Sequence, residues 1–365
     1  MNQTKPWQIP CAAVFSRMLM ALFVLVLVVM PQFAPQARAD ADTAAGKVAN
    51  PGTELWREVR QREAPLAGAT QVTGMDSGVL INTLGEQWRR FRMEQLVPVA
   101  GALIGGVLGL IILFHLFKRG VRLEHGRSGN YIQRFKEIDR ILHWYVATVF
   151  IFLALTGLIL LTGRVVLIPV FGHEVFSAIA SASKEGHNLF GPLFLLGVVG
   201  LFIRFVSKNF PGKGDLGWLL KAGGFLGGKH PSAGFFNAGE KIWFWLVIVV
   251  GLTISVTGLI LEFPFFGQDR PLMALSLVLH GVGAVLLVAG LFGHIYVGTA
   301  GMEASLESMT TGYVDVNWAR QHHDQWAEVC EAEGVVVAGE DLKKKQQLRG
   351  TKNRVPSRPA TEEGQ

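Results

Sequence analysis

Five long apolar runs constrain the fold of this 365-residue chain more than any other feature. Each run is close to the ~20 residues that an α-helix needs to cross about 30 Å of hydrocarbon. A backbone in lipid must satisfy its hydrogen bonds internally, so the runs predict a helical multi-pass membrane protein. The predicted spans are Leu96–Phe117, His143–Leu161, His187–Val206, Trp243–Phe263 and Leu275–Val297.

The N-terminus has the pattern of an export signal. A basic region precedes the apolar stretch Met18–Met30, and the small residues of Ala37–Ala39 suit cleavage before Asp40. Residues 1–39 are therefore predicted to be a signal peptide, and an uncleaved membrane anchor is the alternative. Residues 40–95 are expected to be an exported segment, partly ordered, to which the sequence assigns no role.

Lys and Arg are concentrated in two of the four loops between the spans, as expected for cytoplasmic loops. This distribution accounts for the net charge of +6, so no nucleic-acid partner is expected. The mature N-terminus is then periplasmic and residues 301–365 are a cytoplasmic tail, which indicates a protein of the bacterial inner membrane. The basic residues are Lys118, Arg119, Arg122, Arg127, Arg134, Lys136 and Arg140 in the first loop, and Lys208, Lys213, Lys221 and Lys229 in the third.

The two cysteines, Cys11 and Cys330, are far apart in the sequence. This excludes a disulfide framework, a cysteine-based zinc site and an iron–sulfur cluster built from this chain alone. The adjacent His322 and His323 in the tail are only a weak metal signal. No nucleophile–base pair or phosphate-binding loop stands out, so no catalytic site for substrate chemistry is predicted on this chain.

Four of the ten histidines lie inside or at the ends of the last four spans. His280 and His294 are fourteen residues apart, which on a helix is close to four turns and a rise of about 21 Å. They therefore share one helix face and lie near opposite membrane surfaces. The alternating direction of the spans places His143 at the cytoplasmic level of His294, and His187 at the periplasmic level of His280.

Histidines paired by depth, each pair joining two helices, predict two b-type haems whose iron takes one neutral nitrogen from each side. Residues 119–300 are therefore predicted to be a four-helix di-haem cytochrome b domain, and residues 96–118 an additional transmembrane helix of this all-α fold. A histidine-bearing transporter and a simple assembly anchor are the alternatives from other classes. Glycines that would let a porphyrin approach, or merely let helices pack, are Gly157, Gly191, Gly258, Gly281, Gly283, Gly290 and Gly293.

From about Arg134 to Trp326 the chain resembles the gamma, or cytochrome b, subunit of membrane-bound formate dehydrogenase. The similarity is carried by "RFKEIDRILHWYVATVFIFLALTGLIL", "HNLFGPLFLLGVVGLFIRFV", "FNAGEKIWFW", "LHGVGAVLLVAGLFGHIY" and "WARQHHDQW". The "NAGEK" stretch and the "HHxxW" of the tail favour this family over the cytochrome b subunits of hydrogenases or other molybdo-oxidoreductases, which share the di-haem pattern. The signal peptide and first span have no counterpart in the compact family form, so a long form is expected.

The resemblance implies electron transfer, and no formate site on this chain. A molybdenum- or tungsten-containing alpha subunit would oxidise formate, and an iron–sulfur beta subunit would relay the electrons. This chain would then pass them through two haems to membrane quinone. The ligand pairs implied are His143 with His294 and His187 with His280.

The resemblance also implies quinone contacts in "FNAGEKIWFW", at the cytoplasmic start of the fourth span. Asn237 and Lys241 are the contact residues expected there, with Asn237 donating a hydrogen bond to a quinone carbonyl. Glu240, where the family usually has Gln, would hand on a proton from the cytoplasm. The alternative is that Asn237 only begins the helix, since Asn is a common N-cap.

Overall fold

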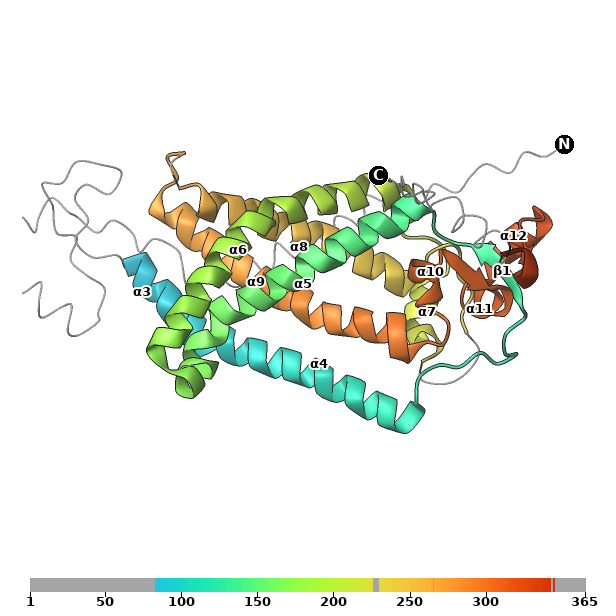
Figure 1. The fold of residues 1–365 in the computed structure, drawn as a ribbon, viewed down its shortest axis with the longest axis horizontal. Coiled ribbons are helices and arrows are strands. Elements are labelled where there is room, and N and C mark those ends of the chain that lie inside the picture. Colours follow the sequence, from blue (N-terminus) through green and yellow to red (C-terminus); the bar gives the residue numbers. More distant parts are fainter. Residues whose placement is uncertain (1–82, 226–229, 265, 343, 345–365) are drawn as a thin grey trace, which may run out of the picture. The chain divides into compact units, whose positions relative to one another are not determined.

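The computed structural model describes residues 83–225, 230–264, 266–342 and 344 of the chain. Within this part, five helices are long and apolar enough to cross a membrane, as predicted. Figure 1 shows them as long ribbons, and the all-α membrane fold is confirmed. The first is continuous through α3 (Thr83–Arg90), the π-helical η2 (Phe91–Leu96) and α4 (Val97–Lys118), and the others are α5 (Glu137–Val166), α6 (Ile168–Phe205), α8 (Ala238–Glu262) and α9 (Arg270–Tyr296).

The helices begin earlier than the apolar runs that predicted them. The first starts at Thr83, so the end of the predicted exported segment is helical, whereas residues 1–82 lie outside the described residues. Ion pairs from Glu86 to Arg89 and Arg90, at helical spacings of three and four residues, support this polar turn. Helix α6 starts at Ile168 and is therefore much longer than the predicted span.

The described residues form two compact units. The first unit contains the described residues up to Leu113 together with Trp144–Pro211 and Ile242–His294, and it is a bundle of membrane helices. Aromatic pairs join α5 to α6: Phe150 stacks on Phe194 with ring centroids 5.4 Å apart, and Phe152 lies 4.6 Å from Phe190. Dispersion between close-packed side chains of this kind holds helices together where lipid removes the hydrophobic driving force.

The second unit contains Phe114–His143, Gly212–Lys241 and Ile295 onward. Its three-stranded antiparallel sheet has the order β2-β1-β3, from β1 (Asn130–Gln133), β2 (Tyr313–Asp315) and β3 (Val337–Ala338). Its short helices are α7 (Asp215–Leu220), η4 (Ala222–Gly224), η5 (Val297–Gly301), α10 (Glu307–Thr310), α11 (Val316–His322) and α12 (Asp324–Ala332), while η3 (Val206–Lys208) follows α6 in the first unit.

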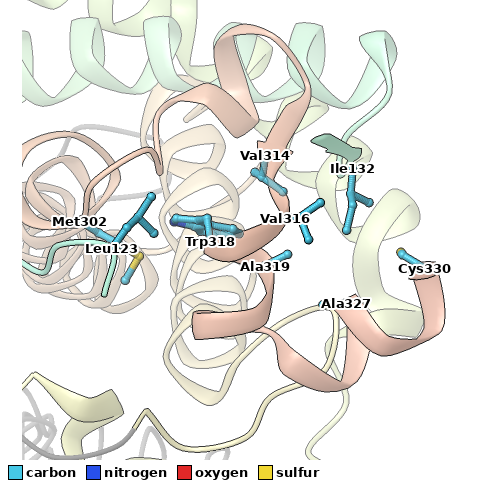
Figure 2. Close-up of a cluster of buried hydrophobic side chains, with 9 residues drawn as sticks. All are labelled: Leu123, Ile132, Met302, Val314, Val316, Trp318, Ala319, Ala327 and Cys330. Carbon is cyan, nitrogen blue, oxygen red and sulfur yellow. The ribbon is translucent and has the colours of Figure 1, made fainter. Parts of the chain in front are cut away.

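A hydrophobic core holds the second unit together. Ile132, Val314 and Trp318 are almost fully buried in it, and Figure 2 shows their side chains gathered between the sheet and the helices. Strand β1 follows the first span, whereas β2, α11 and α12 come from the predicted tail. The tail is therefore a folded element over most of its described length, which the sequence analysis did not predict.

Candidate haem centre

His187 of α6 and His280 of α9 come together in the first unit. Their ring centroids are 6.0 Å apart, with 68° between the ring planes. Two nitrogen–metal bonds of about 2 Å, plus about 1.2 Å from nitrogen to ring centre on each side, need a separation of about 6 Å. The spacing therefore suits one metal ion between the two imidazoles.

The Nδ1 atom of each ring is held by the helix that faces it. His187 Nδ1 lies 2.9 Å from Thr156 Oγ1 of α5, and His280 Nδ1 lies 2.9 Å from the carbonyl oxygen of Ile254 in α8. Thr156 donates its one hydroxyl proton to the Phe152 carbonyl, so it accepts the proton of Nδ1. Both rings then present the lone pair of Nε2, as metal-binding histidines do.

The contacts of the two rings repeat because the sequence repeats. The pentapeptide TGLIL occurs at 156–160 in α5 and at 257–261 in α8. The threonine of each copy lies within 3.4 Å of Nδ1 of one histidine, and a Cβ on each glycine would be 3.2 Å from Cε1 of the same ring. A larger residue would push the ring away. The sequence analysis missed these threonines, because the repeat becomes linked to the histidines only through the packing of the helices.

The other glycines divide between helix packing and open space. A Cβ on Gly283 or Gly290 would lie 2.6 Å from the side chain of Ile254 or Trp243, so these two let α9 approach α8. Gly191, one turn after His187, has no described atom within 4 Å of its Cβ position. Gly283 and Gly290 are therefore explained by close helix packing, whereas Gly191 is not.

A cavity of about 320 Å³ surrounds the two facing imidazoles. Its walls are mostly apolar, and Gly157, Gly191, Gly258 and Gly281 are among its lining residues. Two neutral nitrogen donors, glycines beside them and apolar walls fit a b-type haem, whose macrocycle is flat and largely apolar. The polar lining residues other than the two histidines are Arg92, Asn188, Ser255 and Glu262.

His143 and His294 belong to different units of the structure. His143 lies two turns into α5 and is partly buried. His294 lies in the last turn of α9 and stacks on Trp243 of α8, with ring centroids 5.0 Å apart and 15° between the planes.

The "NAGEK" stretch forms a reciprocal cap at the start of α8. The backbone N–H of Glu240 donates to Asn237 Oδ1 at 3.0 Å, and the backbone N–H of Asn237 donates to Glu240 Oε2 at 2.9 Å. This is the capping-box geometry, so the capping role of Asn237 is observed. The ammonium of Lys241 donates to both carboxylate oxygens of Asp215, at 2.9 and 3.0 Å.

Comparison with known proteins finds relatives of one kind. Residues 134–312 match the family described as prokaryotic cytochrome b561. The nitrate-inducible formate dehydrogenase cytochrome b556(Fdn) subunit of Escherichia coli is 32% identical over 201 residues, which cover 53% of this chain and 89% of that protein. The formate dehydrogenase cytochrome b556 subunit of Haemophilus influenzae is 27% identical over 202 residues, or 53% and 82% of the two chains.

The chain belongs to the family of formate dehydrogenase cytochrome b subunits. It is therefore a multi-pass membrane cytochrome b with a role in electron transfer, and the resemblance noted in its sequence is confirmed. The family match begins at residue 134, after the first membrane helix. Whatever that helix contributes to this cytochrome b subunit is thus additional to the matched region.

A buried arginine at the start of the matched region, Arg134, was missed by the sequence analysis. Its side chain is only 1% exposed, and it donates to Glu240 at 2.9 Å and to the Phe235 carbonyl at 3.0 Å. The rings of Phe135, Phe235, Trp318 and Trp326 lie 5.0 to 5.5 Å from its guanidinium carbon. Burial lowers the pKa of the guanidinium, and Glu240 opposes that shift.

Acidification from pH 7 to pH 5 should destabilise the second unit. Burial, reinforced by nearby His230 and Arg134, lowers the pKa of His322 from 6.5 to about 3. The unfolded chain takes up this proton below pH 6.5 and the folded chain does not, so stability is complete above that pH and falls towards pH 3. His322 should contribute at most about 1.4 kcal/mol per pH unit, and His323, whose pKa is also lowered by burial, adds to the loss.

This pH dependence can be measured as the urea midpoint of the second unit by pulse proteolysis, from pH 5 to pH 7.5. His322→Gln should make the profile less steep, with the remaining slope due to His323, and the exposed His125→Gln should leave it unchanged. A profile equally steep in His322→Gln would assign the titration to another group.

Proposed function

We propose that this chain passes electrons from an iron–sulfur subunit through two b-type haems to membrane quinone, within a formate dehydrogenase complex. The facing pair of His187 and His280 carries the proposal. When bound there, haem iron would supply one-electron redox chemistry. The chain's own task is to hold the iron from both sides, to fix the ring tautomers through Thr156 and Ile254, and to exclude water with apolar walls.

A second haem is proposed between His143 and His294. The proposal is based on their equal distances along α5 and α9 from the His187–His280 level. Gly157, which faces the ring of His187, follows His143 by fourteen residues, and His294 follows His280 by the same number. Equal separations along two helices give equal rises of about 21 Å, so both histidines are expected at one depth.

From the basic loops, that second depth is proposed to lie near the cytoplasm, and the His187–His280 depth near the periplasm. The iron–sulfur subunit would then dock on the periplasmic face, with a molybdenum- or tungsten-containing subunit beyond it. Electrons would enter at the His187–His280 haem and leave from the other. The names of the relatives support a formate dehydrogenase partner set.

The quinone is proposed to bind near the start of α8, where Asn237 lies six residues before Trp243, the residue that stacks on His294. The cap occupies Asn237 Oδ1 and thereby fixes the side chain, while no described residue accepts from its Nδ2. That amide N–H remains able to donate to a quinone carbonyl, so capping and binding are compatible. The proposed contacts of Lys241 and Glu240 compete with their ion pairs to Asp215 and Arg134.

Replacing Asn237 by Asp tests this site without losing the cap. Asp is as good an N-cap as Asn but has no amide donor. Formate-driven quinone reduction by the complex should slow by about tenfold, the effect of one lost hydrogen bond, while both haems remain bound and reducible by formate. Stopped-flow spectra in the haem absorption bands would follow both steps.

Two results would remove this quinone site. Unchanged quinone kinetics in Asn237→Asp would limit Asn237 to capping. Turnover in proteoliposomes that builds no membrane potential would exclude quinone reduction on the cytoplasmic side.

A further inference from the structure

The first membrane helix, which lies outside the family match, reaches the cavity around His187 and His280. Trp88 of α3 and Arg92 of η2 are among the residues that line this cavity. The helix packs on α9 beside the ligand: a Cβ on Gly281 would be 2.9 Å from Leu96 and 3.4 Å from Trp88. Because Gly281 has no side chain, the first membrane helix can pack closely against α9 beside His280. This packing brings Arg92 to the cavity.

The guanidinium of Arg92 has a nitrogen, Nη1, that forms no hydrogen bond to any described residue, and no described carboxylate pairs with it. Its Nη2 donates to the carbonyl oxygens of Leu160 and Leu161 at 2.6 and 2.9 Å, and its Nε to that of Leu161 at 3.3 Å. These acceptors are neutral, and among the described residues neither a hydrogen bond of Nη1 nor an ion pair of Arg92 is formed. A partly buried cation in a membrane helix is costly without an anion, and such residues usually face a functional cavity.

The two charged side chains that line the cavity, Arg92 and Glu262, lie at one end of it, whereas its other polar residues besides the histidines, Asn188 and Ser255, are uncharged. At the end where α5 and α8 finish, it is lined by Arg92 and Glu262 together with Leu160 and Leu161. Towards the interior of the bundle its walls include Phe150, Leu153, Phe194, Ile254 and Val288, all apolar. A ligand that fits must be apolar over most of its surface and carry its charge at one edge. Because Glu262 repels an anion, Arg92 is the group that would hold it.

We infer that Arg92 binds a propionate of the haem held by His187 and His280, so that the additional N-terminal helix completes this haem site. The inference rests on the proposed function, because it needs a haem there. The two propionates are the charged substituents of an otherwise apolar macrocycle, and a guanidinium N–H donates a charge-assisted hydrogen bond to a carboxylate. The bonds to the α5 carbonyls occupy Nε and Nη2, so Nη1 is the nitrogen left to donate to the propionate.

The test uses Arg92→Gln and Arg92→Lys in the full chain in membranes. Arg89→Gln is the matched control, because Arg89 lies on the same helix but is exposed and paired with Glu86. Redox titration followed by visible spectra gives the midpoint potential of each haem, and resonance Raman spectra give the bending bands of the propionates. Chain content is measured separately with a C-terminal tag.

Arg92→Gln should lower the midpoint potential of the His187–His280 haem alone, because a lost positive charge favours ferric iron. It should also weaken retention of that haem by about tenfold to a hundredfold, as expected for a lost charge-assisted bond. Arg92→Lys should keep most of the potential but shift the propionate bands, because an ammonium on a flexible stem binds the carboxylate with a different geometry from the fixed guanidinium. Arg89→Gln should match the unmodified chain.

Unchanged potentials and unchanged propionate bands in both Arg92 variants would overturn the inference. Arg92 would then serve only to hydrogen-bond the first membrane helix to the Leu160 and Leu161 carbonyls of α5. If the Arg92→Gln chain does not accumulate in membranes, the Arg92→Lys variant tests the inference: shifted propionate bands support it, and unchanged bands overturn it. Failure of the proposed function looks different: the unmodified chain would then lack a b-type haem that depends on His187 and His280.

Discussion

Replacing His187 or His280 by alanine should reduce the haem content from two to one per chain and leave the second haem in place. The two imidazoles face each other at 6.0 Å and share one cavity, so either substitution removes half of the iron ligation at that site. A haem with one strong axial ligand is held mainly by packing. His143→Ala and His294→Ala should remove the other haem instead. Pyridine haemochrome assays and the reduced b-type absorption band measure both outcomes.

A matched control is His115→Ala. His115 forms a hydrogen bond with the Tyr296 hydroxyl and is not among the predicted haem ligands. It should retain both haems. Loss of a haem in the opposite combinations, such as one haem depending on His187 and His294, would contradict the depth pairing. Loss of both haems from every variant at normal chain content would show that the two haems assemble only together.

Hydropathy and helical periodicity were sufficient to predict the spans and to bring His187 and His280 together. Both features repeat along one helix, so a sequence displays them directly. The start of the first helix was predicted too late because the residues before Leu96 are polar, and ion pairs at Glu86 stabilise a helical turn there without raising its hydropathy. Length and composition detect the lipid-facing part of a helix, whereas its ends depend on local bonds.

The environment of each histidine could not be predicted in the same way. Thr156 meets His187 only because α5 and α6 pack at one particular register, and Arg92 meets the cavity only because Gly281 admits the first helix. Such contacts depend on tertiary structure between distant parts of the chain. The repeated TGLIL was visible, but the sequence alone gives no reason to connect it with the ligands.

The folded tail was missed for a related reason. Val314 and Trp318 belong to short elements that are too brief for a clear period, and they are buried only by packing against β1, far earlier in the sequence. The buried polar centre beside them, Arg134 with Glu240, combines a loop arginine with the first turn of α8. The basic residues of that loop were used to predict membrane orientation, yet one of them has a structural role that the pattern does not reveal.

Replacing Glu240 by alanine should be among the most destabilising single changes in the second unit. The carboxylate accepts from Arg134 at 2.9 Å and from the backbone of Asn237 at 2.9 Å. Arg134 is 1% exposed whereas Glu240 is 37% exposed, so the substitution leaves a buried guanidinium without its anion. Breaking a buried pair in this way costs about 3–5 kcal/mol, and the partial exposure of Glu240 favours the lower end. Pulse proteolysis in urea should show a midpoint about 1 M lower or more.

The matched control is Glu331→Ala, which breaks an ion pair of similar length on the surface. Arg320 and Glu331 approach to 2.7 Å with the arginine 58% exposed, so its loss should cost less than about 1 kcal/mol. Equal effects of the two substitutions would show that the Arg134–Glu240 pair adds nothing beyond a surface pair. Glu240→Gln removes both the negative charge and the proton-carrying group, and its single amide oxygen can keep either the cap or the bond to Arg134. Unchanged stability with slowed quinone reduction in that variant would assign Glu240 to proton delivery, whereas lower stability with unchanged turnover would assign it to holding Arg134.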